Sequence, residues 1–377
     1  MKKGLLCMVC LALMLSGCSN HQSRDQGSSI QESPVQDFGS TKTYTEIKLD
    51  FDSEEKPGPL GIKDGWFYYC IGSDNYNDTS DYTYWKYNLG SGEKVELGTI
   101  ENHQTSSATY AFIADDKIFT TVGTTEGNLH LIIDAGENRI TTLSKENSFP
   151  PLIFTIKVNE MQFLEFQPSS ISDDGYRYQV RIGNADGTMR EIISKERHSA
   201  TGEMMISPSV YDDIIYTFEY RDENRYICTY DLNGNELSRG SNDMVNDFLD
   251  TPNEYTGSQE TLWSMKVING YYFFNTMSGK QLVLRKENGD YTKIESLSID
   301  NISFVQDSFS NLVDIDGVTF LYDYNTNKFL SLNTNSGELT ELDLKTRHDI
   351  SYMNTDGKNL LYLTDEYDVY YIENAFV

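Results

Sequence analysis

One unit of sequence recurs along most of this chain and constrains its fold more than any other feature. A turn rich in Asp, Asn and Gly leads into an aromatic-rich strand, followed by a polar loop, an alternating strand, a Gly/Asn turn and a further strand. The clearest copy runs from Asp64 to Leu97. The turn and its strand begin seven times, at Asp64, Asp115, Asn159, Asp212, Asn269, Asp316 and Asp356. A repeat of this kind indicates an array of similar supersecondary units.

The second turn of the unit recurs as well, around Gly92, Gly136, Gly187, Gly234, Gly289 and Gly337. Gly and Asn tolerate the positive φ of a tight hairpin, and alternating strand patterns flank each turn. An interval of 40–57 residues matches one four-stranded propeller blade, whereas an antiparallel sandwich would not repeat its turn chemistry in this way. We therefore predict an all-β fold, a single β-propeller of seven four-stranded blades, with six or eight as the alternatives.

The two ends of the repeat region complement each other. The final copy stops after Ile372 and lacks its fourth strand, while residues 44–51 alternate as a strand without a partner. Pairing the two would close the ring and leave no open hydrogen-bonding edge between the chain ends. We predict that this N-terminal strand completes the last blade.

The extreme N-terminus has the pattern of a secretory signal. Lys2 and Lys3 precede an apolar run of eleven residues from Leu5 to Leu15, whereas a membrane-spanning helix needs about 20. The run ends in Leu-Ser-Gly-Cys at Cys18, which resembles the lipobox of bacterial lipoproteins. The resemblance implies cleavage before Cys18 and lipidation of its sulfur. The chain thus divides into a signal peptide (1–17), a lipidated flexible tether (18–43) and the propeller (44–377).

This organisation predicts where the protein resides and which partners it excludes. Acyl chains on Cys18 would hold it in the cell membrane, facing outside the cytoplasm. A formal charge of −28, from 58 acidic and 30 basic residues, would repel nucleic acid and anionic lipid, so the only membrane contact expected is the lipid anchor. We expect a monomer, with Cys70 and Cys228 as two separate buried thiols.

One copy of the first strand has a closer resemblance to a known type. Tyr362-Leu363-Thr364-Asp365 is similar to the Tyr-Trp-Thr-Asp strand of low-density-lipoprotein-receptor propellers. Residues 60–373 as a whole resemble receptor-type propeller domains of unknown function in bacterial lipoproteins. The resemblance implies the architecture and carries no site residues.

The sequence offers little support for an enzyme. It contains no Gly-x-Ser-x-Gly, His-Glu-x-x-His or Walker motif, and no two of its five histidines have metal-ligand spacing. We predict no catalytic residue, metal or cofactor. Glycosidases, however, can work with two carboxylates alone, which this acidic chain supplies. An extracytoplasmic glycan hydrolase or lyase with its site in the propeller channel therefore stays open as the alternative.

Loop lengths point to one face of the ring as the binding surface. Because the chain reverses at every turn, the long segments 73–82 and 241–262 emerge on the same face, which is typical of a binding surface in repeat proteins. Residues 242–249 pair apolar positions four apart and predict a short helix that plugs the channel or caps a blade. The ligand-binding candidates on these segments are Asp74, Tyr76, Asp78, Tyr82 and Tyr255, the alternative for the first loop being a solvated acidic turn. The leading hypothesis is a non-enzymatic propeller that binds a protein, peptide or glycan.

Overall fold

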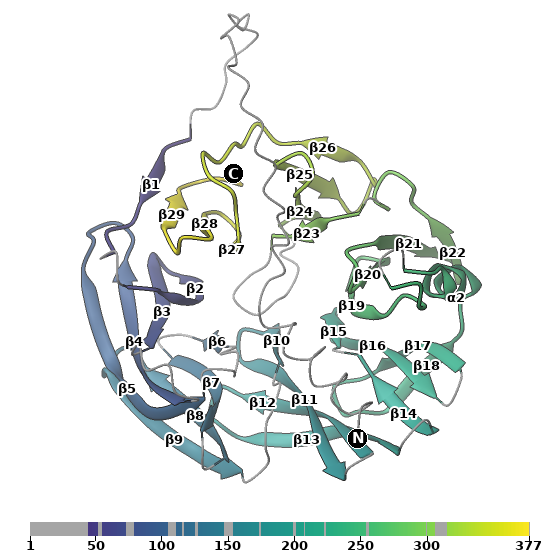
Figure 1. The fold of residues 1–377 in the computed structure, drawn as a ribbon, viewed down its shortest axis with the longest axis horizontal. Helices are drawn as coiled ribbons and strands as arrows, with labels where there is room; N and C mark the ends of the chain where they lie inside the picture. Colours follow the sequence, from purple (N-terminus) through teal and green to yellow (C-terminus); the bar gives the residue numbers. More distant parts are fainter. Residues whose placement is uncertain are drawn as a thin grey trace, which may run out of the picture.

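The computed structural model describes residues 44–376, apart from residues 52–54, 73–78, 105–110, 115–116, 125–126, 147–153, 173–174, 199–200, 207, 222–223, 254–255, 299 and 306–314. Antiparallel sheets follow one another around a central axis as seven blades of a β-propeller (Figure 1). The fold class and the blade number predicted from the repeat are confirmed.

The blades are numbered here in chain order. Blade 1 contains β2 (Gly58–Lys63), β3 (Trp66–Gly72), β4 (Thr79–Asn88) and β5 (Lys94–Gln104). Blade 2 contains β6 (Ala111–Ala114), β7 (Lys117–Thr124), β8 (Gly127–Asp134) and β9 (Arg139–Glu146). Blade 3 contains β10 (Phe154–Asn159), β11 (Gln162–Ser172), β12 (Gly175–Asn184) and β13 (Met189–His198). Blade 4 contains β14 (Thr201–Met205), β15 (Ser209–Tyr211), β16 (Ile214–Arg221), β17 (Asn224–Tyr230) and β18 (Glu236–Gly240).

The remaining blades have shorter second strands. Blade 5 contains β19 (Leu262–Ile268), β20 (Tyr271–Thr276), β21 (Gln281–Glu287) and β22 (Asp290–Lys293). Blade 6 contains β23 (Ile302–Phe304), β24 (Val318–Asp323), β25 (Lys328–Asn333) and β26 (Leu339–Glu341). Blade 7 contains β27 (Tyr352–Thr355), β28 (Leu360–Leu363), β29 (Val369–Ile372) and, from the other end of the chain, β1 (Glu46–Lys48).

The N-terminal strand closes the ring as predicted. β1 pairs antiparallel with β29, with Ile47 opposite Tyr371, and the N–H of Leu49 donates to the carbonyl of Val369 at 2.9 Å. The observed strand is shorter than the predicted segment 44–51. It still supplies the outer strand of blade 7, so the first and last segments of the described chain share one sheet.

The first turn of each unit joins the inner strand of a blade to the next strand. At Asp64-Gly65 both central residues have positive φ, 49° and 78°, and Asn269-Gly270 adopts 42° and 79°. Two successive left-handed residues define a type I′ turn, whose twist matches the flanking strands and which favours Asn, Asp and Gly. The Asp/Asn-Gly pairs that begin at residues 64, 269 and 316 therefore set the geometry of their hairpins. The turn predicted at Asp115 lies outside the described residues.

Two faces of the ring follow from this connectivity. We call the side that carries the first-to-second and third-to-fourth strand turns the hairpin face. The opposite side, which carries the second-to-third strand loops and the links between blades, is the loop face. The helix α2 (Asp243–Asp250) belongs to the loop face, between β18 and β19. Its buried Val245 and Leu249 pack among side chains of blades 4 and 5, so the short predicted helix is confirmed and caps blades.

The loop face is uneven in height. The second strand has eleven residues in blade 3 but four in blade 7, although both begin directly after the first turn. That difference is roughly 23 Å of extended strand at about 3.3 Å per residue. Blades 3 and 4 are also joined into one sheet through the pairing of β13 with β14, and blades 1 and 2 through β5 with β7. The second strands of blades 5–7, with six, six and four residues, are the shortest second strands in the ring.

The core lies between the blades rather than at one centre. Side chains from facing sheets form hydrophobic clusters at successive blade interfaces, and aromatic rings contribute much of them. Phe273 of blade 5 meets Phe304 of blade 6 edge to face with ring centroids 4.6 Å apart, a favoured aromatic geometry. Cys70 and Cys228 are both buried and free, as predicted. In the described part of the chain no helix is long and apolar enough to cross a membrane.

Candidate functional site

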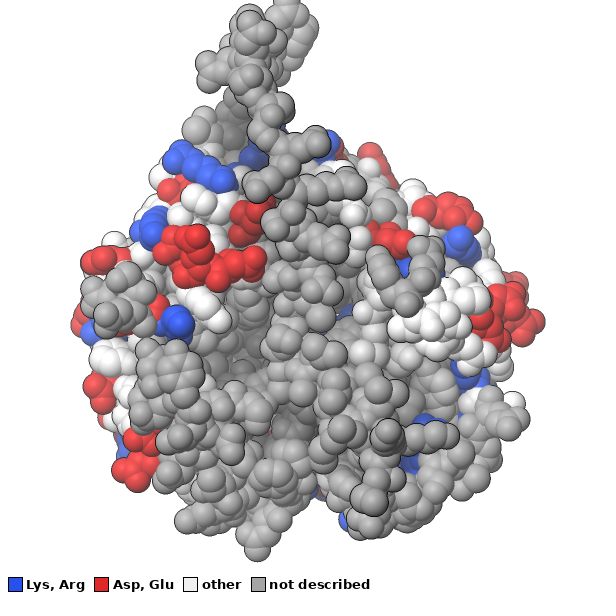
Figure 2. Space-filling view, in the orientation of Figure 1, with Lys and Arg blue, Asp and Glu red and all other residues white. Residues whose placement is uncertain are grey.

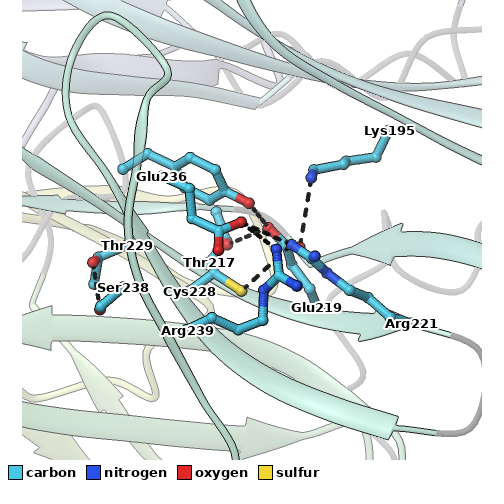
Figure 3. Close-up of polar contacts among 10 residues, drawn as sticks. Lys195, Thr217, Glu219, Arg221, Cys228, Thr229, Glu236, Ser238 and Arg239 are labelled. Carbon is cyan, nitrogen blue, oxygen red and sulfur yellow. Dashed lines mark hydrogen bonds and ion pairs between the residues drawn. The ribbon is translucent and has the colours of Figure 1, made fainter.

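Between blades 3 and 4 lies a polar cluster that contains acidic, basic, thiol and phenol side chains (Figure 3). Its centre is Glu219 of β16, whose side chain is fully inaccessible to solvent. Its partners come from β13, β16 and β17, and β18 supplies Glu236, which pairs with Arg221. The surrounding residues of the cluster are Lys195, Thr217, Arg221, Cys228, Tyr230, Glu236 and Arg239.

The carboxylate of Glu219 is saturated with donors. Thr217 Oγ1 and Tyr230 OH donate to its Oε1 at 2.9 and 2.5 Å. Arg221 donates to its Oε2 through Nε at 3.1 Å and Nη2 at 2.8 Å. A carboxylate offers about four lone-pair sites, so none is left to accept a proton from a substrate. This geometry ties strands together and does not suit a general base.

The other reactive groups of the cluster are held in their protonated forms. Burial, and after it the charge of Glu219, raise the pKa of the Cys228 thiol to about 12. The nucleophilic thiolate is therefore scarce at neutral pH. Burial and the hydrogen bond to Glu219 likewise raise the pKa of Tyr230, so its phenol stays a donor.

A second buried acid lies between blades 2 and 3. Glu165 of β11 faces His130 of β8, with 3.3 Å between Oε1 and Nδ1, and Arg181 of β12 lies 3.7 Å from its other oxygen. Both Glu165 and His130 are buried. Like Glu219, this acid is engaged by basic side chains inside a blade interface, a place where unpaired charge would be costly.

The accessible candidate site is on the loop face. Seven large hydrophobic side chains of the described residues are exposed, and four of these belong to the loop face of blades 5–7. They are Trp263, Met277, Tyr324 and Tyr367, which are 37, 43, 40 and 48% exposed. We call these four residues the apolar surface. Isolated exposed apolar residues are ordinary, so it is the occurrence of these four on one face of the ring that makes this face the candidate site.

A strand irregularity presents Trp263. The pairing of β19 with β20 shifts register between Leu262 and Ser264, so Trp263 is the extra residue of a β-bulge. Its neighbour Leu262 is buried while Trp263 is exposed. β19 is the inner strand of blade 5, and Trp263 lies near its loop-face end. Bulges commonly re-aim a side chain beside a functional site.

Backbone and amide hydrogen bonds lock the loops of blades 5 and 6 together. The Asn301 N–H donates to the Gly279 carbonyl at 3.0 Å, and Asn301 Nδ2 donates to Asn325 Oδ1 at 3.1 Å. Asn325 Nδ2 in turn donates to the Asp300 carbonyl at 2.7 Å, while the Tyr324 N–H donates to the Asn301 carbonyl at 3.1 Å. Three separate chain segments thus form one cross-linked support beneath Tyr324.

Blade 5 anchors its own loop through a buried acid. Glu260 accepts hydrogen bonds from Ser278 Oγ at 2.8 Å and Asn253 Nδ2 at 3.3 Å, and Lys280 Nζ lies 3.2 Å from its Oε1. Burial alone would raise the pKa of Glu260, but these donors outweigh it and the pKa is lowered. The ionised carboxylate holds the segment that carries Met277.

Charge is unevenly distributed over this face. Figure 2 shows acidic side chains gathered over the blade of β27–β29, with basic groups beside them, and a white area near β19 and α2 that charged groups of both signs surround. Asp365 and Glu366, in the loop before Tyr367, are exposed. Tyr367 itself has a φ of 65°, and the Lys56 ammonium lies 5.7 Å from its ring centroid.

The structure places one of the predicted ligand-binding residues. Tyr82 lies in β4 opposite Gly72, half-buried, and its ring covers that glycine so closely that a Cβ there would approach Cζ to 2.9 Å. The segment predicted as a loop up to Tyr82 is therefore strand from Thr79 onward. The remaining candidates, Asp74, Tyr76, Asp78 and Tyr255, lie outside the described residues, as does Cys18. A ligand-binding role for Tyr82 and these four candidates stays a prediction, as does lipidation of Cys18.

Sequence reasoning missed the apolar surface. It assigned the tyrosines to strand alternation, and Tyr324 and Tyr367 look like other strand-end tyrosines until the blade boundaries are known. The signal that could have found them is position, because both fall in second-to-third strand loops, on the same face as the long segments. No sequence pattern predicts the β-bulge at Trp263. Among the described residues no group of His, Cys, Asp and Glu could hold a metal ion.

Comparisons with known proteins bear on the fold alone. No protein-family model and no curated protein sequence matches the chain. An acylaminoacyl peptidase from Pyrococcus horikoshii aligns over 84% of this chain and 51% of its own, with a TM-score of 0.52 and 13% identity. An inactive virginiamycin B lyase variant from Staphylococcus aureus aligns over 88% and 99%, with a TM-score of 0.50 and 12% identity. BamB from Moraxella catarrhalis aligns over 88% and 100%, with a TM-score of 0.47 and 12% identity.

Proposed function

We propose that this chain is a lipid-anchored, extracytoplasmic binding protein whose propeller holds a protein, peptide or glycan on the loop face. The anchor is Cys18, preceded by a basic and apolar signal segment, and residues 18–43 are the tether. A coil of about 25 residues has a root-mean-square reach near 25–30 Å. That reach would let the ring engage partners clear of the lipid headgroups.

The observation that carries the proposal is the apolar surface on its cross-linked support. Exposed aromatic and methionine side chains add nothing to the packing of the ring itself, whereas burying them against a partner is favourable. The hydrogen bonds of Asn301 and Asn325 hold the surrounding loops in one arrangement. Preorganised loops lose less conformational entropy when a partner binds.

The enzyme alternative, a glycan hydrolase or lyase in the channel, has weaker support. The two buried acids at the interfaces of blade 3, Glu165 and Glu219, are engaged by neighbouring side chains within those interfaces. A glycosidase would instead need two carboxyl groups about 5–10 Å apart that both face the sugar.

Site-specific photo-cross-linking in the native host tests the proposal. A photoreactive residue at Met277 is compared with one at Leu237, which is exposed on the outer strand of blade 4. We expect a discrete adduct from position 277 and none from position 237. The same adducts from both positions, or none from either, would contradict binding through the loop face. Mass analysis of the purified protein, expected to begin at an acylated Cys18, tests the anchor separately.

A further inference from the structure

The chemistry of the apolar surface narrows the kind of partner it fits. Trp, Tyr and Met are enriched at the centres of protein–protein interfaces, whereas Lys, Glu and Asp are depleted there. Trp263, Met277 and Tyr324 show this composition on two adjacent blades. Trp and Tyr are also the residues that most often dominate binding energy, because they bury a large area with few rotatable bonds.

The polar groups between these anchors are amides and hydroxyls on a fixed frame. The loop of blade 6 reads Tyr324-Asn325-Thr326-Asn327, all exposed. Asp323 holds its shape by accepting from the Asn325 N–H at 2.8 Å and from Thr326 Oγ1 at 2.7 Å. Rigid aromatic anchors set among Asn, Ser and Thr are the arrangement by which antibody loops recognise protein surfaces.

The charges around the apolar surface are mostly negative. Asp365 and Glu366 directly precede Tyr367, and the carbonyl of Asp300 accepts from Asn325, the neighbour of Tyr324; all three acids are exposed. Three nearby ammonium groups are paired with acids: Lys280 lies 3.2 Å from Glu260, Lys328 2.8 Å from Glu341 and Lys48 2.7 Å from Asp368. The Lys56 ammonium lies 5.7 Å from the centroid of the Tyr367 ring. On a chain of net charge −28, the exposed acids attract cationic partners and repel acidic glycans.

We propose that the apolar surface binds a protein segment in which an aromatic or aliphatic anchor is flanked by Lys or Arg. The anchor contacts Trp263 and Tyr324, and the basic flank faces Asp365 and Glu366. The inference rests on the proposed binding function and deepens it, because it selects a basic peptide segment over a glycan.

A random peptide library tests this proposal with a defined probe. Full-length protein in detergent is used to select phage-displayed dodecapeptides, and the selected sequences are synthesised for titration. We expect them to combine Lys or Arg with Trp, Phe, Leu or Ile, and to bind less tightly as salt is raised. Trp263→Ala should weaken them about 30-fold, the effect of losing one central aromatic anchor worth about 2 kcal/mol. The control Met161→Ala, an exposed residue on the hairpin face, should leave affinity within about twofold.

The outcomes separate this inference from the proposed function. Selected peptides without basic residues, or equal binding by the Trp263→Ala protein, would overturn the basic-segment inference. The same protein is applied to an array of neutral and acidic glycans. Glycan binding that is lost in Trp263→Ala, with no peptide selected, would overturn the inference and leave the binding function standing. If neither the peptides nor the glycans bind through the loop face, both the basic-segment inference and the proposed binding function are overturned. Unchanged thermal melting shows that Trp263→Ala remains folded.

Discussion

The saturated carboxylate of Glu219 makes a quantitative prediction about stability. Glu219→Gln keeps the shape of the side chain but removes its charge from a fully buried position beside Arg221 and Lys195, whose side chains are 14 and 15% exposed. Removing one partner from a buried ion pair costs about 3–5 kcal/mol. Because Arg221 retains Glu236 at 3.1 Å, we expect the lower end, about 3 kcal/mol.

Glu236→Gln is the matched control within the same cluster. Its carboxylate also binds Arg221, but the side chain is 31% exposed. Partly exposed pairs contribute about 0.5–1 kcal/mol. With an m-value near 3 kcal/mol per molar urea, the midpoint of unfolding should fall by about 1 M for Glu219→Gln and by less than about 0.3 M for Glu236→Gln. Equal shifts, or a larger one for Glu236→Gln, would refute the assignment of Glu219 as the structural centre.

Three further changes test the fold. Ile47→Pro removes a backbone donor from the pairing of β1 with β29, and it should lower the free energy of unfolding by about 3 kcal/mol in a thermal melting assay. Ile47→Ala, at the same exposed position, should cost less than about 1 kcal/mol. Equal effects of the two changes would argue against closure of the ring by β1. Gly234→Ala should lower the free energy of unfolding by at least about 3 kcal/mol, because the new Cβ would lie 1.9 Å from the Ile192 carbonyl oxygen. Gly257→Ala, also at positive φ but in open space, should cost about 1 kcal/mol in the same melting assay. Burial raises the pKa of Cys228 from 9.0 to about 12, so this thiol ionises first in the unfolded chain. The free energy of unfolding should therefore fall as the pH rises from 9 to 12. Rapid reaction of the Cys228 thiol with maleimide in the native protein at about pH 8 would contradict its burial.

The fold was predictable because its signals are local. Asp64-Gly65 and Asn269-Gly270 adopt the left-handed turn that their residue types favour. The closing strand was identifiable because residues 44–51 lacked a partner and the last copy lacked a strand. The helix after Asn242 was visible from its spacing, and the Asn242 side chain caps it by accepting from the Val245 N–H.

What the sequence hid depends on contacts between distant segments. Glu219 meets Lys195 only because blades 3 and 4 face each other, and no spacing rule predicts that pair. The joining of β13 to β14 depends on a hairpin that continues past the blade. The bulge at Trp263 reflects a register mismatch with β20, which alternation along one strand cannot reveal.

The most direct test of the account is the accessibility of single cysteines in living cells. The chain is favourable for this, since Cys70 and Cys228 are buried and free. Thr326→Cys, beside Tyr324 on the loop face, is compared with Met161→Cys on the hairpin face, using a membrane-impermeant maleimide on intact cells and on purified protein.

The account predicts that Met161→Cys reacts in both settings, which requires a location outside the cytoplasm. Thr326→Cys should react in the purified protein but be protected in cells, and adding Trp263→Ala should remove the protection. Equal labelling of both cysteines in cells would contradict an occupied loop face, and absence of labelling at both would contradict the extracytoplasmic location.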